Sequence, residues 1–350
     1  MKLGFVGTPQ SGKSTLFCAV TRRQLEPHVF GAGRPVLGVV SVPDARLDFL
    51  TETFRPKKKV EAQMEILDLP GLPLEEQESR RREILAQVRD AEGLVLVIPA
   101  FESDSPDDTD WRGLAETIEL EFLYADLEQI EKRIEKLEVQ ITKPTKTQGD
   151  DKRELEVLRR LQDASDSIES FRAVELSPEE EKALRGFRFL ARKPVLLALN
   201  VAEAALERAT ELEAALPRPG LVLCAELELQ MSELSDEERG EFLAAFPIDE
   251  PVGPRLLRQG YELLGLASFF TYGEDECRAW TIRKGDNAVT AAGKIHTDLA
   301  RGFIRAEVFS FDDFRATPSI KDLKAAGKWR LEGKEYIVQD GDCIVIRSGV

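Results

Sequence analysis

A phosphate-binding loop is the clearest chemical signal in the sequence. Residues 7–15 read Gly-Thr-Pro-Gln-Ser-Gly-Lys-Ser-Thr, which matches the pattern G-x-x-x-x-G-K-[ST] in full. In such a loop the backbone N–H groups face phosphate oxygens, the lysine reaches the β and γ phosphates, and the hydroxyl after it can bind Mg²⁺. The pattern predicts ATP or GTP as the ligand. The residues predicted to contact it here are Gly7, Pro9, Gln10, Ser11, Gly12, Lys13, Ser14 and Thr15.

The second part of the predicted site is Asp68-Leu69-Pro70-Gly71. Asp68 ends an apolar run, where its carboxylate can hold Mg²⁺, and the Gly71 N–H can meet the γ-phosphate. An aspartate at a strand end is more often a turn residue, so the metal role depends on the complete loop that precedes it. We therefore predict Lys13 and Gly71 as catalytic residues, and Ser14 and Asp68 as Mg²⁺ ligands.

Base recognition is predicted after two later apolar runs. Asn200-Val201-Ala202-Glu203 stands where ordinary GTPases present Asn-Lys-x-Asp, whose aspartate accepts two hydrogen bonds from guanine. The longer Glu203 does not reach the same depth, so strict GTP specificity is not expected and adenine becomes a candidate. Alternatively, Asn200 and Glu203 only cap a helix and supply its first-turn acid. Cys224 and Ala225, after the next run, are predicted to form a second base-side loop.

The elements that must position these residues alternate between strands and helices. Apolar runs of strand length lie at 2–6, 36–42, 64–69, 93–99, 194–199 and 221–224, and helix-like segments lie at 77–89 and 204–215. This alternation predicts an α/β fold with a mostly parallel sheet that binds its ligand at the carboxyl ends of the strands.

Residues 112–190 have a different, helical pattern. Apolar residues three and four apart form a heptad seam, and a segment with proline and glycine at 143–150 separates it from a second apolar face at 155–171. We predict an inserted antiparallel helical hairpin, a coiled coil; the alternative is that both helices lie flat on the sheet domain. The seam consists of Leu120, Leu123, Leu127, Ile130, Ile134, Leu137 and Ile141.

A small α+β domain is predicted to close the chain. From residue 266 onward, short β-like runs at 277–282, 303–309, 336–338 and 343–346 alternate with glycines and Asp-Gly steps. The predicted domains are a nucleotide-binding domain at 1–111 and 191–265, the helical insertion at 112–190 and the C-terminal domain at 266–350.

Composition narrows the class of protein. The chain has 350 residues, 42% of them hydrophobic, and a formal net charge of −16, which argues against a protein that coats nucleic acid by charge alone. No apolar stretch has the roughly 20 residues of a membrane span. Four widely spaced cysteines favour neither a zinc site nor a disulfide framework. We expect a cytoplasmic protein without membrane or DNA partners.

The order of these motifs resembles the YchF or Obg-like ATPase family of translation-factor GTPases, over essentially the whole length. The likeness is most specific at 278–285, 291–298 and 302–308, which look like that family's TGS domain, a β-grasp module. Residues 40–48 look like the family's strand after switch I. The resemblance implies Mg²⁺-dependent ATP hydrolysis with relaxed base choice and association with ribosomes or RNA.

Several positions depart from the family pattern. Gln10-Ser11 replaces Asn-Val, and in 30–35 Ala32 takes the place of the switch I threonine. Leu72 stands where Ras-like enzymes keep a water-orienting glutamine; the family itself has a hydrophobic residue there. The histidine expected shortly after Glu102 is absent. Glu75, Glu76 and Gln77 are candidates for water positioning, or simply a solvated charged face.

Two functions remain open from the sequence. The first is a hydrolysing switch that engages ribosomes; the second is a nucleotide-dependent binding module with little or no hydrolysis. A small-molecule kinase fits the loop but not the D-x-x-G continuation. In the C-terminal domain, Trp280 and Phe303 lie among basic residues, which suits RNA, but both are equally expected in the core. His296 is expected to be structural.

Overall fold

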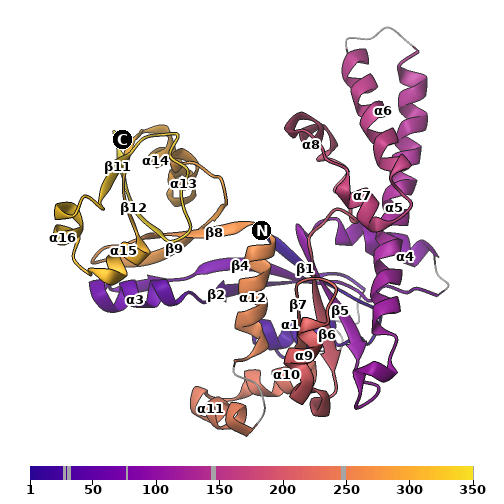
Figure 1. Cartoon of the computed structure of the whole chain (residues 1–350), viewed down its shortest axis with the longest axis horizontal. Helices are drawn as coiled ribbons and strands as arrows, with labels where there is room; N and C mark the ends of the chain where they lie inside the picture. The colour runs from indigo at the N-terminus through magenta and orange to yellow at the C-terminus, as the bar shows by residue number, and fades with distance from the viewer. Residues whose placement is uncertain (27–28, 30–32, 76–77, 143–146, 246–249, 350) are drawn as a thin grey trace. The chain divides into compact units, whose positions relative to one another are not determined.

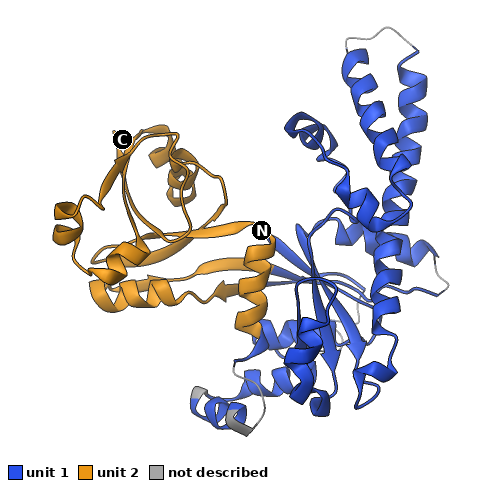
Figure 2. Ribbon diagram, viewed as in Figure 1, with its two compact units in different colours: residues 1–38, 66–252 blue, residues 39–65, 253–350 orange. Residues whose placement is uncertain are grey.

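The computed structural model describes residues 1–26, 29, 33–75, 78–142, 147–245 and 250–349. Its contacts divide the chain into two compact units, shown in Figure 2. Unit 1 contains residues 1–38 and 66–252, and unit 2 contains residues 39–65 and 253–350. The compact units therefore do not coincide with the predicted domains: the nucleotide-binding and helical parts share one unit, and residues 39–65 and 253–265 join the C-terminal part.

The first sheet carries the predicted strand, loop and helix alternation (Figure 1). Its strand order is β2-β4-β1-β5-β6-β7, and the pairs β1–β5, β5–β6 and β6–β7 are parallel. Each apolar run expected at these positions forms a strand, which confirms the α/β class. The bounds are β1 (Lys2–Val6), β2 (Val36–Val42), β4 (Ala62–Asp68), β5 (Gly93–Ala100), β6 (Val195–Val201) and β7 (Gly220–Leu223).

The central strands are buried because helices cover the sheet. All seven residues of β6 are buried, as an apolar run in a parallel sheet requires. The predicted helix at 77–89 is α4, and the one at 204–215 divides into a 3-10 turn and a short α-helix. The bounds are α1 (Lys13–Thr21), α4 (Glu78–Val88), η1 (Pro106–Asp108), η2 (Glu203–Arg208), α9 (Ala209–Ala214), α10 (Ala225–Glu233) and α11 (Asp236–Ala245).

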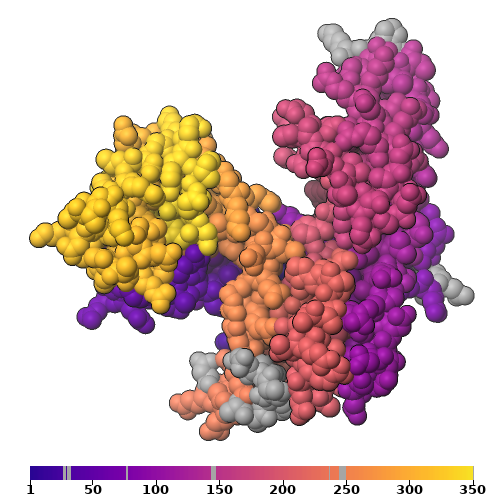
Figure 3. All heavy atoms as spheres, viewed as in Figure 1, coloured from indigo at the N-terminus to yellow at the C-terminus, as the bar shows by residue number. Residues whose placement is uncertain are grey.

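The helical hairpin is present in unit 1. It consists of α5 (Trp111–Gln140) and α6 (Gln148–Asp163), followed by α7 (Ile168–Ala173) and α8 (Pro178–Leu184). The helix α6 contacts α5 and α8, whereas α5 also contacts β5 and α4. In the space-filling view the side chains of the hairpin, coloured magenta, close against one another (Figure 3). The hairpin interpretation is thus correct, and the flat-lying alternative applies only to the part of α5 that packs on β5.

The predicted seam is right in its distal half. Ile130, Ile134 and Leu137 are buried together with Leu158 of α6 in one core. Leu120 was also predicted in the seam, but its side chain is 39% exposed. The reason is that the start of α5 turns a different face, which includes the buried Ile118 and Phe122, toward the rest of unit 1.

A buried ion pair joins α5 to the segments that precede β5 and β6. Asp126 is fully buried and accepts hydrogen bonds from Arg89 Nη1 at 2.6 Å and from the Ala191 N–H at 2.8 Å. Burial raises the pKa of Asp126 from its ordinary value, and the positive charge of Arg89 opposes that change. Because a buried carboxylate is costly unless it is fully bonded, this arrangement specifies where α5 lies.

Unit 2 is built on a second sheet with the order β11-β10-β12-β8-β9-β3. It combines antiparallel pairs, such as β10–β12 and β8–β9, with the parallel pairs β12–β8 and β3–β9. The strands are β3 (Lys58–Val60), β8 (Leu266–Thr271), β9 (Glu276–Arg283), β10 (Phe303–Ser310), β11 (Arg330–Glu332) and β12 (Asp342–Ser348). The helices are α3 (Ala45–Phe54), α12 (Val252–Leu263), α13 (Ala288–Ile295), α14 (Thr297–Arg301), α15 (Phe311–Ala316) and α16 (Ile320–Ala325).

Two expectations about unit 2 are wrong. The strand expected at 336–338 is only an isolated bridge between Ile337 and Asn287, because Tyr336 O and the Val338 N–H bond to Ala288 and Asp286 at the start of α13 rather than to a continuous neighbour. The strand-like segment 40–48 ends at Val42, since Asp44 caps α3 by accepting a hydrogen bond from the Arg46 N–H.

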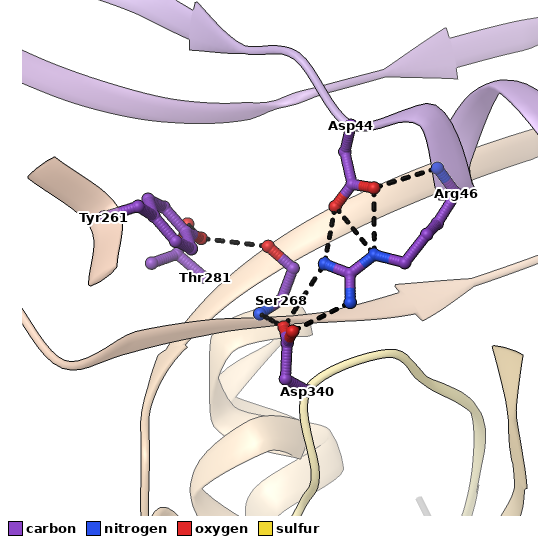
Figure 4. Close-up of polar contacts among 6 residues, drawn as sticks. All are labelled: Asp44, Arg46, Tyr261, Ser268, Thr281 and Asp340. Carbon is purple, nitrogen blue, oxygen red and sulfur yellow. Dashed lines mark hydrogen bonds and ion pairs between the residues drawn. The ribbon is translucent and has the colours of Figure 1, made fainter. Parts of the chain in front are cut away.

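The Arg46 guanidinium joins the early and late segments of unit 2 (Figure 4). It donates to both carboxylate oxygens of Asp44 and, through Nη1, to Asp340 Oδ2 at 2.8 Å. Asp340 in turn accepts a hydrogen bond from the Ser268 N–H at 2.8 Å, and Arg46 lies over the Phe270 ring. Residues 39–65 are therefore part of this fold.

Candidate phosphate and nucleotide site

The glycine-rich loop connects β1 to α1 with backbone conformations that suit its composition. Gln10 and Gly12 have φ of 62° and 87°, in the left-handed region. A Cβ on Gly12 would collide with the Asn200 side-chain nitrogen, and one on Gly7 with the Val97 backbone oxygen. Both glycines of the motif are thus required by close approach, as well as by the turn at Gly12.

Lys13 is the first residue of α1, and its side chain is buried beside the loop. Its ammonium donates to the Thr8 backbone oxygen at 3.5 Å, which is a long hydrogen bond. Burial lowers the pKa of Lys13, and the carboxylate of Asp68 partly opposes this. A buried ammonium with so little compensation is suited to an anion such as a phosphate.

Ser14 and Asp68 meet although 54 residues separate them in the chain. The Ser14 hydroxyl donates to Asp68 Oδ2 at 2.7 Å, while Asp68 Oδ1 is buried without a hydrogen-bond partner. Burial raises the pKa of Asp68 to about 6, and the hydrogen bond from Ser14 and the charge of Lys13 act in the opposite direction. A hydroxyl and an under-bonded carboxylate are ligands that Mg²⁺ prefers, so the donor set fits this metal.

The segment after Asp68 lies directly on the phosphate loop. The Leu72 N–H donates to the Gly7 backbone oxygen at 2.9 Å. A Cβ on Gly71 would lie 2.7 Å from the Pro9 nitrogen, so only glycine fits there. The Leu72 side chain is fully buried in the core of unit 1 and presents no polar group to the loop.

Asn200 holds two loops of the site together. Its Nδ2 donates to the Ser11 backbone oxygen at 3.1 Å, and its Oδ1 accepts from the Ala225 N–H at 2.9 Å. It does not cap η2, the helix that follows it, because the N-cap there is Ala202. The capping interpretation is therefore wrong for that helix, and Asn200 instead bonds to the first residue of α10.

Comparisons with known proteins agree with this geometry. A family model described as a 50S ribosome-binding GTPase matches residues 2–143, and the YchF GTPase C-terminal model, described as a protein of unknown function, matches residues 266–348. The ribosome-binding ATPase YchF of Haemophilus ducreyi is 38% identical over 366 residues, covering 100% of this chain and 99% of that protein. The chain belongs to the YchF family.

Other YchF proteins extend the comparison. The ribosome-binding ATPase YchF of Bacillus subtilis is 38% identical over 365 residues, covering 99% of each chain. The solved structure of the Schizosaccharomyces pombe YchF GTPase is 28% identical, with a TM-score of 0.83 and coverage of 99% of this chain and 97% of that chain. The predicted family resemblance is confirmed.

The remaining residues predicted to contact the base lie at or just after the ends of β6 and β7. Val201 is fully buried as the last residue of β6. Glu203 is exposed in the first turn of η2, as the first-turn-acid alternative supposed. Cys224 is half-buried at the N-cap of α10, and Ala225 is buried. The structure thus brings Asn200 and Ala225 to the phosphate loop.

Some positions considered from the sequence lie outside the described residues: Phe30, Gly31, Ala32, Glu76 and Gln77. Glu75 is described and exposed. Gly33 is the first described residue after 30–32. It has φ of 68°, and its backbone oxygen accepts a hydrogen bond from Arg80 at 3.4 Å. Sequence reasoning did not anticipate this contact between the two switch segments, because Arg80 is one of three consecutive arginines with no distinguishing pattern.

The C-terminal candidates are mainly structural. Phe303 is a core residue, whereas Trp280 is partly buried with the Arg278 guanidinium 4.1 Å from its ring centroid. His296 Nδ1 accepts a hydrogen bond from the Asp298 N–H, so His296 caps α14 as expected for a structural residue. Arg278 and Trp280 thus form one basic and aromatic pair at the edge of this core.

Other site types have no support in the described part of the YchF chain. All four cysteines are free thiols. Among the described residues there is no cluster of three or more histidine, cysteine, aspartate or glutamate side chains that could hold a metal. None of the described helices combines the length and apolar character needed to cross a bilayer.

Proposed function

We propose that this protein binds a purine nucleoside triphosphate with Mg²⁺ and hydrolyses it as a conformational switch that associates with ribosomes. The observation that carries the proposal is the contact between Ser14 and Asp68 beside Lys13. These are the three side chains that a P-loop nucleotide site needs, and they come together from two segments that are distant in the sequence.

The phosphates are bound by the loop that precedes α1. Lys13 supplies the positive charge for the β and γ oxygens, and the N–H groups of the loop and of the first turn of α1 supply hydrogen bonds. The left-handed conformations of Gln10 and Gly12 support this role, because successive N–H groups then point to one side of the loop. The contributing residues are Gly7, Pro9, Gln10, Ser11, Gly12, Lys13, Ser14 and Thr15.

Mg²⁺ is held by Ser14 and Asp68. The hydroxyl and the under-bonded carboxylate support this assignment, since Asp68 Oδ1 has no hydrogen-bond partner. Bound there, the metal neutralises charge that develops on the β and γ phosphate oxygens. Lys13 and the Gly71 N–H act from this chain on the same oxygens, and the buried Leu72 side chain keeps apolar surface under the loop.

The base is bound at Asn200, Val201, Glu203, Cys224 and Ala225. Of the two Nδ2 hydrogens of Asn200, one is used by the Ser11 oxygen, so one N–H remains for a purine ring nitrogen. The exposed Glu203 then decides between ATP and GTP. Two relatives carry the name ribosome-binding ATPase, which supports ATP hydrolysis, ribosome association and a cytoplasmic location for this chain.

Equilibrium dialysis of the purified protein against ATP and against GTP, with Mg²⁺, tests the proposal. We expect retention of ATP at least as strong as that of GTP, and a loss of about 100-fold in affinity for Lys13→Ala, because a buried charge-assisted phosphate contact is removed. Lys58→Ala, which removes an exposed lysine of β3, is the control. Retention of neither nucleotide would refute the proposed site.

Phosphate release distinguishes the switch from a binding module. The second function is supported by two departures in the sequence: Ala32 in place of the switch I threonine, and the absence of the histidine expected shortly after Glu102. Tight ATP binding with no phosphate production above the Lys13→Ala variant would establish the binding module. Sedimentation with ribosomes at low salt, with and without ATP, tests the partner, and failure to co-migrate in either state would contradict it.

A further inference from the structure

An open cavity in unit 1 lies at the end of the first sheet opposite the phosphate loop. It has a volume of about 670 Å³ and is lined by Lys2, by residues 89–92, by Pro194 and by side chains of segment 176–193. Lys2 begins β1, and Pro194 directly precedes β6, whereas the phosphate loop follows the other end of β1. The length of β1 separates the two places by about 15 Å, so this cavity does not belong to the nucleotide site.

The lining of this cavity is basic although the chain as a whole is acidic. Its acidic lining residues are Asp90, Glu92 and Glu181, and its basic ones are Lys2, Arg89, Arg185, Arg188, Arg192 and Lys193. Six basic against three acidic side chains give a local excess of positive charge in a protein whose net charge is −16. Such a concentration of one sign attracts anions.

Part of this charge is compensated by ion pairs. Arg89 bonds to the buried Asp126, and Arg188 bonds to Asp90 at 2.6 Å. The side chains of Lys2 and Arg185 make no hydrogen bond or ion pair with another residue in the described part of the chain. They are therefore available to a ligand.

Arg192 and Lys193 are held by neutral groups. Arg192 donates to the backbone oxygens of Phe171 and Val174 at 2.9 and 3.0 Å. Lys193 donates to the backbone oxygens of Arg89, at 3.2 Å, and of Ala91. These carbonyls fix the two cations at the cavity without neutralising them. Burial and then the charge of Arg89 lower the pKa of Lys193 to about 8, against the charges of Asp126 and Glu92, so Lys193 is still mostly protonated at pH 7.

The negative charge that acts on Arg192 comes from Glu181, which follows the capping box of α8. Glu181 is exposed, so it can move aside more easily than the fixed cations. The exposed Arg185 guanidinium can bind a phosphate through paired hydrogen bonds. Arg192, whose two terminal nitrogens already donate to backbone oxygens, contributes its charge.

We propose that this cavity is a second anion site, which binds phosphoryl groups other than those of the nucleotide in the P-loop. Lys2, Arg185, Arg192 and Lys193 supply the positive charge, and the nearby Glu181 carboxylate opposes anion binding. The phosphoryl groups belong either to a small free phosphate compound or to an RNA backbone. The inference does not depend on the proposed nucleotide function.

The test is calorimetric titration of inorganic pyrophosphate into the full chain carrying Lys13→Ala, which removes the P-loop contribution. Pyrophosphate is expected to bind, and Lys2→Gln with Arg185→Gln is expected to weaken it about tenfold or more. Lys182→Gln is the matched control for Arg185→Gln alone, because each removes one positive charge and only Arg185 lines this cavity. Glu181→Gln should tighten binding.

Competition identifies the source of the phosphoryl groups. Displacement of pyrophosphate by a short single-stranded oligouridylate assigns the site to an RNA backbone, and binding of pyrophosphate without such displacement assigns it to a free anion. The proposal is overturned if pyrophosphate does not bind to the Lys13→Ala chain. It is equally overturned if Lys182→Gln weakens binding as much as Arg185→Gln alone does.

Discussion

Asp68 is the residue of the nucleotide site whose charge depends most on its surroundings. Its carboxylate is buried with one oxygen lacking a hydrogen-bond partner, and burial raises its pKa to about 6. In the metal-free protein the folded state therefore holds this proton more strongly than the unfolded state does. Above pH 6 the buried, ionised carboxylate destabilises the folded state. Between pH 6 and the pKa of about 4 that Asp68 has in the unfolded chain, this destabilisation decreases as the pH falls.

Asp68→Asn is expected to stabilise the metal-free protein, because the amide cannot ionise. The gain in the free energy of unfolding should be on the order of 2–3 kcal/mol at pH 7 and below about 1 kcal/mol at pH 4.5. Urea unfolding of both proteins without Mg²⁺ at the two pH values measures it. An equal difference at both pH values would show that ionisation of Asp68 is not the cause.

Asn200→Ala is expected to destabilise the fold by about 2–3 kcal/mol, because it leaves the Ser11 oxygen and the Ala225 N–H buried without partners. Glu203→Ala should change stability by less than about 0.5 kcal/mol, since that side chain is exposed. Thermal unfolding of the two variants measures their effect on stability, and dialysis against ATP and GTP measures their effect on nucleotide binding. If Glu203→Ala alters neither stability nor the preference between ATP and GTP, Glu203 does not read the base.

For single residues, the sequence predicted chemical roles better than it predicted which side chains contact each other. The phosphate loop was identifiable because its residue types and spacing are fixed by the geometry of a triphosphate. The bridge made by Asn200 was not, because its partners Ser11 and Ala225 are 189 and 25 residues away. The cationic cavity was also missed, although Arg185, Arg188, Arg192 and Lys193 stand close together in the sequence.

The hairpin shows how buried charge positions an element. Asp126→Ala removes the hydrogen-bond partner of Arg89 and of the Ala191 N–H. It should lower the free energy of unfolding by about 3–5 kcal/mol. Glu154→Ala, which breaks the partly exposed pair with Arg133 on the same hairpin, should cost at most about 1 kcal/mol. Urea unfolding at pH 7 measures both. Equal losses would mean that Asp126 contributes no more than a surface pair.

Elements were predictable where burial imposes a periodic pattern. The central strands β5 and β6 are nearly continuous apolar runs, β2 alternates between buried and less buried residues, and the distal hairpin is a regular seam. The helix α3 was read as the end of a strand, because the cap formed by Asp44 lies directly after the apolar residues of β2. The three-residue strands β3 and β11 are too short to show a period.

At the scale of the whole molecule, unit 2 is discontinuous in sequence. Phe49 and Phe54 of α3 pack against Phe311 and Phe314, respectively, and β3 pairs with β9. A C-terminal fragment alone would leave these surfaces exposed. The predicted boundary at residue 266 could not reveal this, because composition changes there while the packing partner lies 200 residues earlier in the chain.

A fragment of residues 253–350 is therefore expected to fold poorly, whereas residues 39–65 joined to it by a flexible linker should give one cooperative transition. The difference in unfolding free energy should be about 3 kcal/mol or more, from the lost aromatic packing. Amide dispersion in NMR spectra and thermal unfolding measure it. Arg46→Ala in the joined fragment is expected to lower stability, and an equally stable short fragment would contradict the discontinuous unit.

This discontinuity has a consequence for how the chain is made. Residues 39–65 are synthesised long before their partners, which begin at residue 253. At a translation rate of about 5–20 residues per second, α3 and β3 wait on the order of 10–40 s before the later segment of their unit begins to be synthesised. The nucleotide-binding unit can be assembled during that interval, so the second unit is completed after the first.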